Sequence, residues 1–107
     1  MFIICGDGVD RKYFIDICKV ENIKFKYIGM IDYHKRDSFY ELIDVLILNP
    51  YKKSKRNGWC TVINESLLCG KPVICNKYVG ASFLVDNKTK GFVIDDNHYL
   101  SLFKSLK

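Results

Sequence analysis

The fold of this chain is decided at residues 58–74, which read GWCTVINESLLCGKPVI. Residues 61–69 have helical character, and the glycine and proline that follow them are typical of a helix end. Gly70 can adopt the left-handed conformation after the last turn, and Pro72 cannot continue a helix. An apolar run at residues 72–75 begins at once. The stretch therefore predicts a helix that leads directly into a buried strand.

The rest of the chain repeats this alternation. Short apolar runs without polar interruption, typical of parallel strands covered on both faces, lie at residues 2–5, 24–28, 45–48 and 91–94. Segments of helical period lie at 10–20, 38–43 and 99–106. The apolar stripe of the first would be Tyr13, Phe14, Ile17 and Cys18, and that of the second Phe39, Leu42 and Ile43. The predicted fold class is α/β, a Rossmann-like parallel sheet with right-handed crossovers and flanking helices.

The composition fits one such domain, 1–107. Of the 107 residues 49% are hydrophobic, which can supply a core and argues against disorder. The five cysteines are odd in number and lack the paired spacing of metal ligands, so we expect reduced thiols, a cytoplasmic protein and no metal or other cofactor. No apolar run reaches the ~18–20 residues of a membrane span, and no signal segment opens the chain. The net charge of +5 is modest and does not indicate a nucleic-acid partner.

Ligands of open parallel sheets bind beyond the carboxyl ends of the strands, so the loops there are the candidate site. The first contains Gly6 and Gly8, the second reads Gly29-Met30-Ile31, and the third runs over residues 49–60 into the helix that carries Glu65. Each feature also has a purely structural interpretation. Glycines after a strand can simply turn the chain, and a glutamate in a first helical turn is favourable without any ligand. The basic cluster Lys52, Lys53, Lys55 and Arg56 can be an ordinary solvated loop.

Taken together, these loops resemble one known family. The motifs are IICGDG at 3–8, YIG at 27–29, YELIDVLIL at 40–48, the whole of 58–74, VGA at 79–81 and GFVI at 91–94. In this order they are similar to the C-terminal, nucleotide-sugar donor-binding domain of retaining GT-B glycosyltransferases of family four, also described as glycosyl transferases group 1. The resemblance covers residues 3–94 and implies a partial donor-binding domain.

The resemblance also implies roles for individual residues. Glu65 would hold the ribose of a nucleotide diphosphate sugar, and the backbone after Gly29 would meet the nucleobase. The residues implied in donor binding are Gly6, Gly8, Gly29, Met30, Ile31, Gly58, Thr61, Val62 and Glu65. Asn57 stands at the donor-sugar position, where the family has an acidic residue, and is the catalytic candidate. Asparagine can bond sugar hydroxyls but cannot stabilise developing positive charge as a carboxylate can. Cys60 stands where glycine is usual.

Larger parts of the family's architecture are not found in this sequence. The family's nucleotide domain opens with a strand and a basic loop that neutralises the diphosphate, and its acceptor-binding domain is separate. We therefore expect the chain to need a partner that supplies the acceptor-binding domain, through which it would also meet a membrane, and to be inactive alone. The resemblance most often implies sugar transfer in the synthesis of a surface polysaccharide or glycolipid. The alternatives are a non-catalytic nucleotide-binding remnant or a phosphoacceptor receiver-like domain, the latter on Asp7, Asp10 and Lys77.

The resemblance makes one prediction about strand order. The doubly wound order is 3-2-1-4-5-6, and residues 2–5 correspond to its second strand and 45–48 to its fourth. The central strand would then be absent, and its two neighbours would each have an open edge. We expect these neighbours to pair directly or to receive a strand from another chain, because buried backbone groups rarely stay unpaired. A gap of about two strand spacings is expected only if the chain is incomplete. Pairing of 24–28 with 45–48 would contradict the correspondence.

Overall fold

The computed structural model describes residues 1–50 and 59–95, and the chain divides into two compact units. We call residues 1–36 the N-terminal unit and residues 37–107 the C-terminal unit. Each is described by itself. The helix expected at 99–106, the basic cluster at 52–56, and both Asn57 and Gly58 lie outside the described residues.

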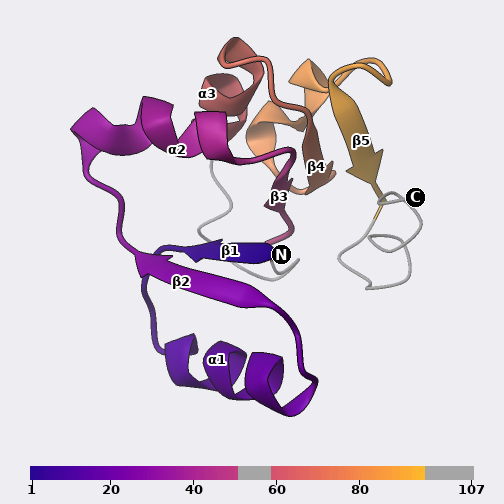
Figure 1. Cartoon of the computed structure of the whole chain (residues 1–107). Helices are drawn as coiled ribbons and strands as arrows, with labels where there is room; N and C mark the ends of the chain where they lie inside the picture. Colours follow the sequence, from indigo (N-terminus) through magenta and orange to yellow (C-terminus); the bar gives the residue numbers. More distant parts are fainter. Residues whose placement is uncertain (51–58, 96–107) are drawn as a thin grey trace. The chain divides into compact units, whose positions relative to one another are not determined.

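The N-terminal unit is one strand–helix–strand element followed by a short turn of helix. β1 (Phe2–Cys5) leads through α1 (Arg11–Val20) into β2 (Phe25–Gly29), and the 3-10 helix η1 (Tyr33–Lys35) follows. β1 and β2 are parallel, with Phe2 opposite Phe25, and α1 is the crossover between them (Figure 1). The two strands expected at 2–5 and 24–28 and the helix expected at 10–20 are confirmed to within one residue at each end.

Little of the N-terminal unit is buried. The stripe predicted on α1 is largely wrong as a buried face, because only Cys18 is buried, at 8% exposure, while Phe14 is 54% exposed. Tyr13 and Val20 are more exposed still. The helical period of these residues is real, but a stripe is buried only where another layer packs on it. Two strands and one helix offer too little surface to cover it.

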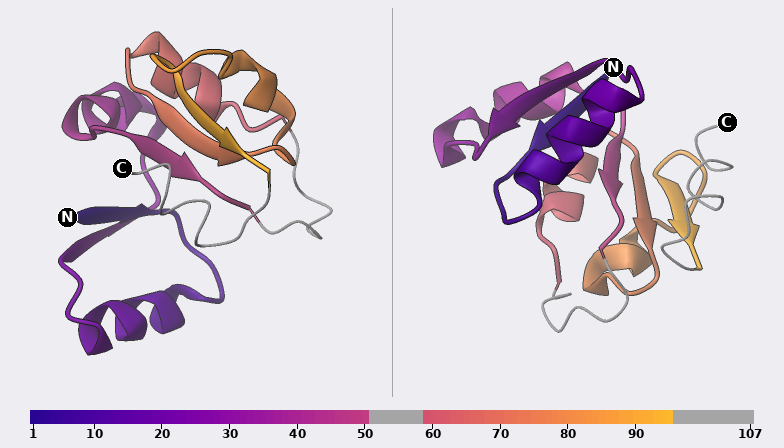
Figure 2. Two further views of the ribbon diagram at one scale, coloured as in Figure 1. Left: turned by 90° about the vertical axis from the view of Figure 1, so that its right-hand side faces the viewer. Right: turned by 90° about the horizontal axis from the view of Figure 1, so that it is seen from below.

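The C-terminal unit carries a three-stranded parallel sheet. Its elements are α2 (Arg36–Leu42), β3 (Leu46–Leu48), α3 (Val62–Leu68), β4 (Val73–Asn76), the 3-10 helix η2 (Gly80–Leu84) and β5 (Gly91–Ile94), with α2 starting at the unit boundary. The strand order is β3-β4-β5, so β4 is paired on both edges (Figure 2). All four residues of β4 are buried. The uninterrupted apolar run thus marks the central strand of this sheet.

The core of the C-terminal unit forms between α3, β4 and η2. Its buried members are Ile63, Val73, Cys75, Val79, Ala81 and Val85. Gly91 is required at the start of β5, because a Cβ there would lie 1.8 Å from the carbonyl oxygen of Val73 and its φ is +128°. The predicted helix end is confirmed: Gly70 has φ +73° and its amide donates to the carbonyl of Leu67. On α2 the prediction was partly wrong, since Tyr40 is buried and Leu42 is 75% exposed.

The strand orders agree with the predicted correspondence in part. Within the N-terminal unit β1 pairs with β2, and within the C-terminal unit the order is β3-β4-β5, as the order 3-2 and 4-5-6 requires. Pairing between strands of different units, including the expected pairing of β1 with β3, stays a prediction. Parallel strands in two small sheets with flanking helices confirm the Rossmann-like α/β fold class. A single domain over 1–107 stays a prediction.

Candidate functional site

The carboxylate of Glu65 lies on α3 and is held by a buried tyrosine. Glu65 is half-buried. The Tyr40 hydroxyl on α2 donates to Glu65 Oε2 at 2.8 Å. The same hydroxyl lies 3.4 Å from the Val62 carbonyl oxygen. A carboxylate that takes a short hydrogen bond from a rigid ring has a defined direction, which suits recognition of a neutral donor such as a sugar diol.

α3 begins within one residue of the position that the sequence predicts. It runs from Val62 after Thr61, and its first turn is tightened by a bond from the Ile63 amide to the Cys60 carbonyl oxygen. Cys60 has φ +63°, a left-handed conformation that glycine adopts without strain. The conformation at this position explains why glycine would be favoured there. Cys60 nevertheless packs against the core.

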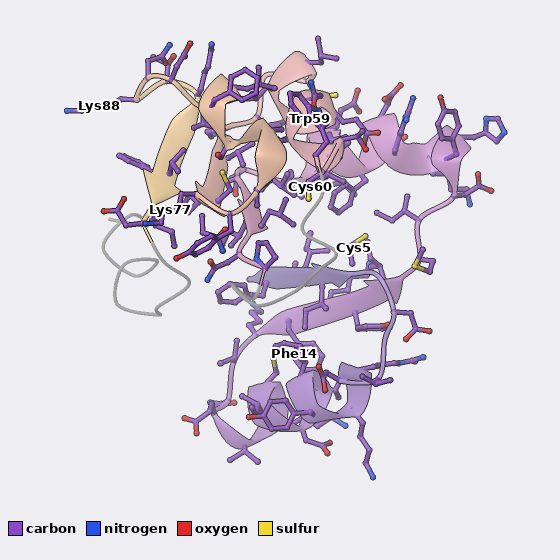
Figure 3. The ribbon with its side chains drawn as sticks, turned by 180° about the vertical axis from the view of Figure 1, so that it is seen from behind. Cys5, Phe14, Trp59, Cys60, Lys77 and Lys88 are labelled. Carbon is purple, nitrogen blue, oxygen red and sulfur yellow. The ribbon has the colours of Figure 1, made fainter. Side chains whose placement is uncertain are left out.

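Trp59, the residue before Cys60 (both are labelled in Figure 3), makes three contacts. The Trp59 indole N–H donates to Asn64 Oδ1 at 2.8 Å, and its ring meets Phe83 edge-on with centroids 5.4 Å apart. Its carbonyl oxygen accepts from the Ala81 amide. Through Trp59, these contacts connect the start of α3 to η2, the 3-10 helix that follows β4. They define where the loop before α3 ends.

The carboxyl ends of β3 and β4 are joined by two asparagines. Asn76 is fully buried, and its Nδ2 donates to Asn49 Oδ1 at 2.9 Å and to the Pro50 carbonyl oxygen at 2.7 Å. Its Oδ1 accepts from the Tyr78 amide. A buried side-chain amide with these three partners is satisfied and holds the two strand ends in register.

In the N-terminal unit the loops after β1 and β2 are brought together. The Gly6 amide donates to the Gly29 carbonyl oxygen at 2.8 Å, and both glycines have positive φ. The Tyr27 hydroxyl donates to the Gly6 carbonyl oxygen at 2.6 Å and lies 3.2 Å from Asp7 Oδ1. Desolvation, together with the bond to Asp7 and its charge, raises the pKa of Tyr27. This loop pair is ordered by its own hydrogen bonds.

The predicted donor-binding residues therefore fall into two groups. Gly6, Gly8, Gly29, Met30 and Ile31 belong to the N-terminal unit, while Thr61, Val62 and Glu65 belong to the C-terminal unit. Within the first group the structure joins Gly6 to Gly29, and Met30 is 77% exposed beside them. The binding roles of all these residues stay predictions, as does the role of Asn57.

Among residues 1–50 and 59–95, no three histidine, cysteine, aspartate or glutamate side chains are grouped as a metal site would need. Within the same ranges no helix has the length and apolar character to cross a bilayer.

Sequence reasoning missed Tyr40 as a site residue. Its position in the 40–48 motif was part of the resemblance, but the helical stripe singled out its neighbours Phe39 and Leu42 instead. The sequence signal for Tyr40 was weak, because its helix reads RDSFYEL and carries polar and charged side chains on either side of Tyr40. Trp59 and Asn64 were likewise quoted only as part of a motif, since their contact depends on how the loop turns into α3.

These elements define a Rossmann-like α/β protein with an oriented carboxylate on the helix between two parallel strands. A family model described as glycosyl transferases group 1 matches residues 1–106, so the chain belongs to that family. The resemblance that the motifs indicated is confirmed, and the receiver-like alternative is set aside. Comparison with the curated proteins and with the solved structures gave no match.

Proposed function

We propose that this chain is the donor-binding part of a glycosyltransferase and binds a nucleotide diphosphate sugar through the ribose and diphosphate of its nucleotide. The observation that carries the proposal is the half-buried Glu65 carboxylate, directed by Tyr40 at 2.8 Å, in a chain of the group 1 family. Family membership supports sugar transfer in general. The residue-level roles are the proposed part.

In the proposed reaction the bond between the anomeric carbon and the β-phosphate oxygen breaks, and a bond from that carbon to an acceptor oxygen forms. The acceptor loses a proton, and the nucleoside diphosphate leaves. The proposed contribution of this chain is binding: Glu65 accepts from the ribose diol, the backbone near Thr61 and Val62 approaches the diphosphate, and the loop at Gly29 meets the base. No metal is part of the proposal.

We propose further that an acceptor-binding domain or chain acts with this one, in the cytoplasm, in synthesis of a surface polysaccharide or glycolipid. Reaction in this class of enzyme needs closure around both substrates, which excludes water and brings the reacting atoms together. The alternative of a non-catalytic nucleotide-binding remnant rests on Asn57, which lacks the charge that the donor-sugar position carries in the family.

The experiment is calorimetric titration of the 107-residue chain with UDP and GDP. Glu65→Ala is expected to lower the affinity for whichever nucleotide binds by more than about tenfold, because each charge-assisted bond contributes about 1.5–3 kcal/mol. Glu41→Ala is the matched control, since Glu41 is an exposed carboxylate on α2. Absence of binding by either nucleotide, or equal affinity of parent and Glu65→Ala, would contradict the proposal. Sugar transfer that appears only when an acceptor-binding partner is added separates an enzyme half from a remnant.

A further inference from the structure

We propose that Asp7 and Gly8 form a modification site in the loop between β1 and α1, at which Asp7 rearranges spontaneously to isoaspartate through a cyclic imide (Figure 1). The inference concerns the chemical ageing of the chain and is independent of the proposed function. It starts from one contact: the Gly8 amide donates to Asp7 Oδ1 at 2.9 Å. The nitrogen that would close the ring therefore already lies beside the carboxyl group.

The rearrangement needs only these two residues and water. A bond forms between the Gly8 nitrogen and Asp7 Cγ, and one carboxyl oxygen leaves as water with the carboxyl proton and the amide proton. A second water then opens the ring at one of its two carbonyl carbons. Opening at Cγ restores aspartate. Opening at the main-chain carbon of Asp7 breaks the original peptide bond and leaves Gly8 joined to the chain through Cγ, which is isoaspartate.

The local structure leaves room for ring closure. A Cβ built on Gly8 would meet no atom within 4 Å, and both Asp7 and Gly8 are exposed. Glycine also presents the least hindered nitrogen, because it has no Cβ beside the attacking atom. The Tyr27 hydroxyl lies 3.2 Å from the same Oδ1 that the Gly8 amide contacts, so the carboxyl group is held near the backbone of the loop.

The rearrangement would change this loop because the chain is attached on both sides of the pair. The Gly6 amide donates to the Gly29 carbonyl oxygen at 2.8 Å, and the Arg11 amide donates to the Gly8 carbonyl oxygen at 3.2 Å. Isoaspartate adds a methylene group to the main chain between these attachments and moves the free carboxylate onto the α-carbon. The present contacts of Asp7 Oδ1 would then be lost, and the loop would change shape with no change in composition.

A purely structural interpretation makes a different prediction. An aspartate that accepts from the next amide can serve only to complete a turn, and an ordered turn hinders ring closure. In that case the folded chain would react far more slowly than a flexible peptide with the same residues. If the loop instead holds the reacting atoms together, the folded chain should react about as fast as the peptide.

The test incubates the full chain and a synthetic peptide of residues 3–12 at physiological temperature in mildly acidic buffer. Isoaspartate is measured by methyl transfer from S-adenosylmethionine with a protein isoaspartyl methyltransferase, and tryptic mapping assigns its position. We expect it to accumulate at Asp7, within about tenfold of the rate in the peptide, a difference of about 1.4 kcal/mol in the barrier. Gly8→Ala should slow the reaction by about tenfold or more, because alanine hinders the attacking nitrogen.

Two internal comparisons assign the signal. Asp16 lies within α1, and it should stay unmodified because the helix fixes its backbone. Asn57 and Gly58 can form the same ring from asparagine, but trypsin cleaves at Arg11 and Arg56 and so separates them from Asp7. No isoaspartate at Asp7, formation far slower than in the peptide, or an unchanged rate in Gly8→Ala would each overturn the inference.

Discussion

The two units of this chain are built from the same kind of sequence but differ in how much of it they bury. In the C-terminal unit β4 is paired on both edges and Ile63, Val73 and Cys75 are fully buried. In the N-terminal unit β1 has one partner, and Cys18 is the only buried hydrophobic residue within 1–36, all of which the structure describes. Apolar runs predict strands in both units. A strand becomes a core strand only when neighbours cover its edges and faces.

The largest expected difference between the units concerns their glycines. Gly91→Ala would place a Cβ 1.8 Å from the Val73 carbonyl oxygen at φ +128°, so we expect more than about 4 kcal/mol of destabilisation and loss of the β4–β5 ladder. Gly6→Ala in the N-terminal unit has φ +107° but no atom within 4 Å, so only backbone strain of about 1–3 kcal/mol is expected. Urea denaturation, followed unit by unit with amide hydrogen exchange, measures both.

Gly8→Ala is the control for this pair, since Gly8 has no atom within 4 Å and no positive φ. It should unfold close to the parent. Equal destabilisation by Gly91→Ala and Gly6→Ala would show that close packing at β5 does not distinguish the units.

An isoleucine pair gives a smaller difference. Ile63→Ala empties a site of 0% exposure in the C-terminal core, and we expect a loss of about 2–5 kcal/mol in the free energy of unfolding. Ile17→Ala on α1 should cost less than about 1.5 kcal/mol, because Ile17 is 37% exposed and alanine favours the helix. Chemical denaturation of each variant measures the costs, with Ile63→Val as the conservative control. A cost at Ile17 equal to that at Ile63 would mean that α1 is packed as tightly as α3.

The smallest expected effect at neutral pH concerns Cys75, whose titration makes the stability of the fold depend on pH only in the alkaline range. Burial, with the nearby Cys60, raises the pKa of Cys75 to about 11, above the ~8.5 of an unfolded thiol. Because the folded state holds this proton more tightly, the stabilisation is complete below the unfolded pKa and is lost as pH rises toward the folded pKa. Melting temperatures of the parent should therefore fall between about pH 8.5 and 11, and Cys75→Ala should fall less steeply over that window.

Thiol labelling at mildly alkaline pH checks the same comparison between units. Burial also raises the pKa of Cys5, but Cys5 is exposed, whereas Cys75 is buried. We expect an aromatic disulfide reagent to modify Cys5 in the folded chain and Cys75 only after unfolding. Labelling of Cys75 at the rate of Cys5 would indicate that the C-terminal core opens as readily as the N-terminal unit.

Much of the local structure could be predicted from the sequence. The strand at 2–5 and the strand at 91–94 are where the apolar runs indicate, and the helix predicted at 61–69 is observed as Val62–Leu68. Gly70 could be assigned because a left-handed residue after a helix is a local property of one residue. The buried face of α2 could not be assigned in the same way. Tyr40 and Leu42 both fit an apolar helix, and which of them is buried depends on the position of α3.

The candidate site follows the same division. Glu65 and the loop glycines could be selected from the sequence because motifs place them after strands or in a first helical turn. The contact of Glu65 with Tyr40 could not be predicted, since Tyr40 is distant in sequence and reaches it only when α2 packs beside α3.

By itself, then, the sequence determined the α/β class, the element positions, the family and the choice of Glu65, because these depend on residue type and short-range spacing. Tertiary structure alone decided which apolar runs became core, that residue 60 must be left-handed, and that Tyr40 holds the Glu65 carboxylate. The physical reason is that burial and hydrogen bonding between elements depend on the distances between groups far apart in the chain, which no local pattern specifies.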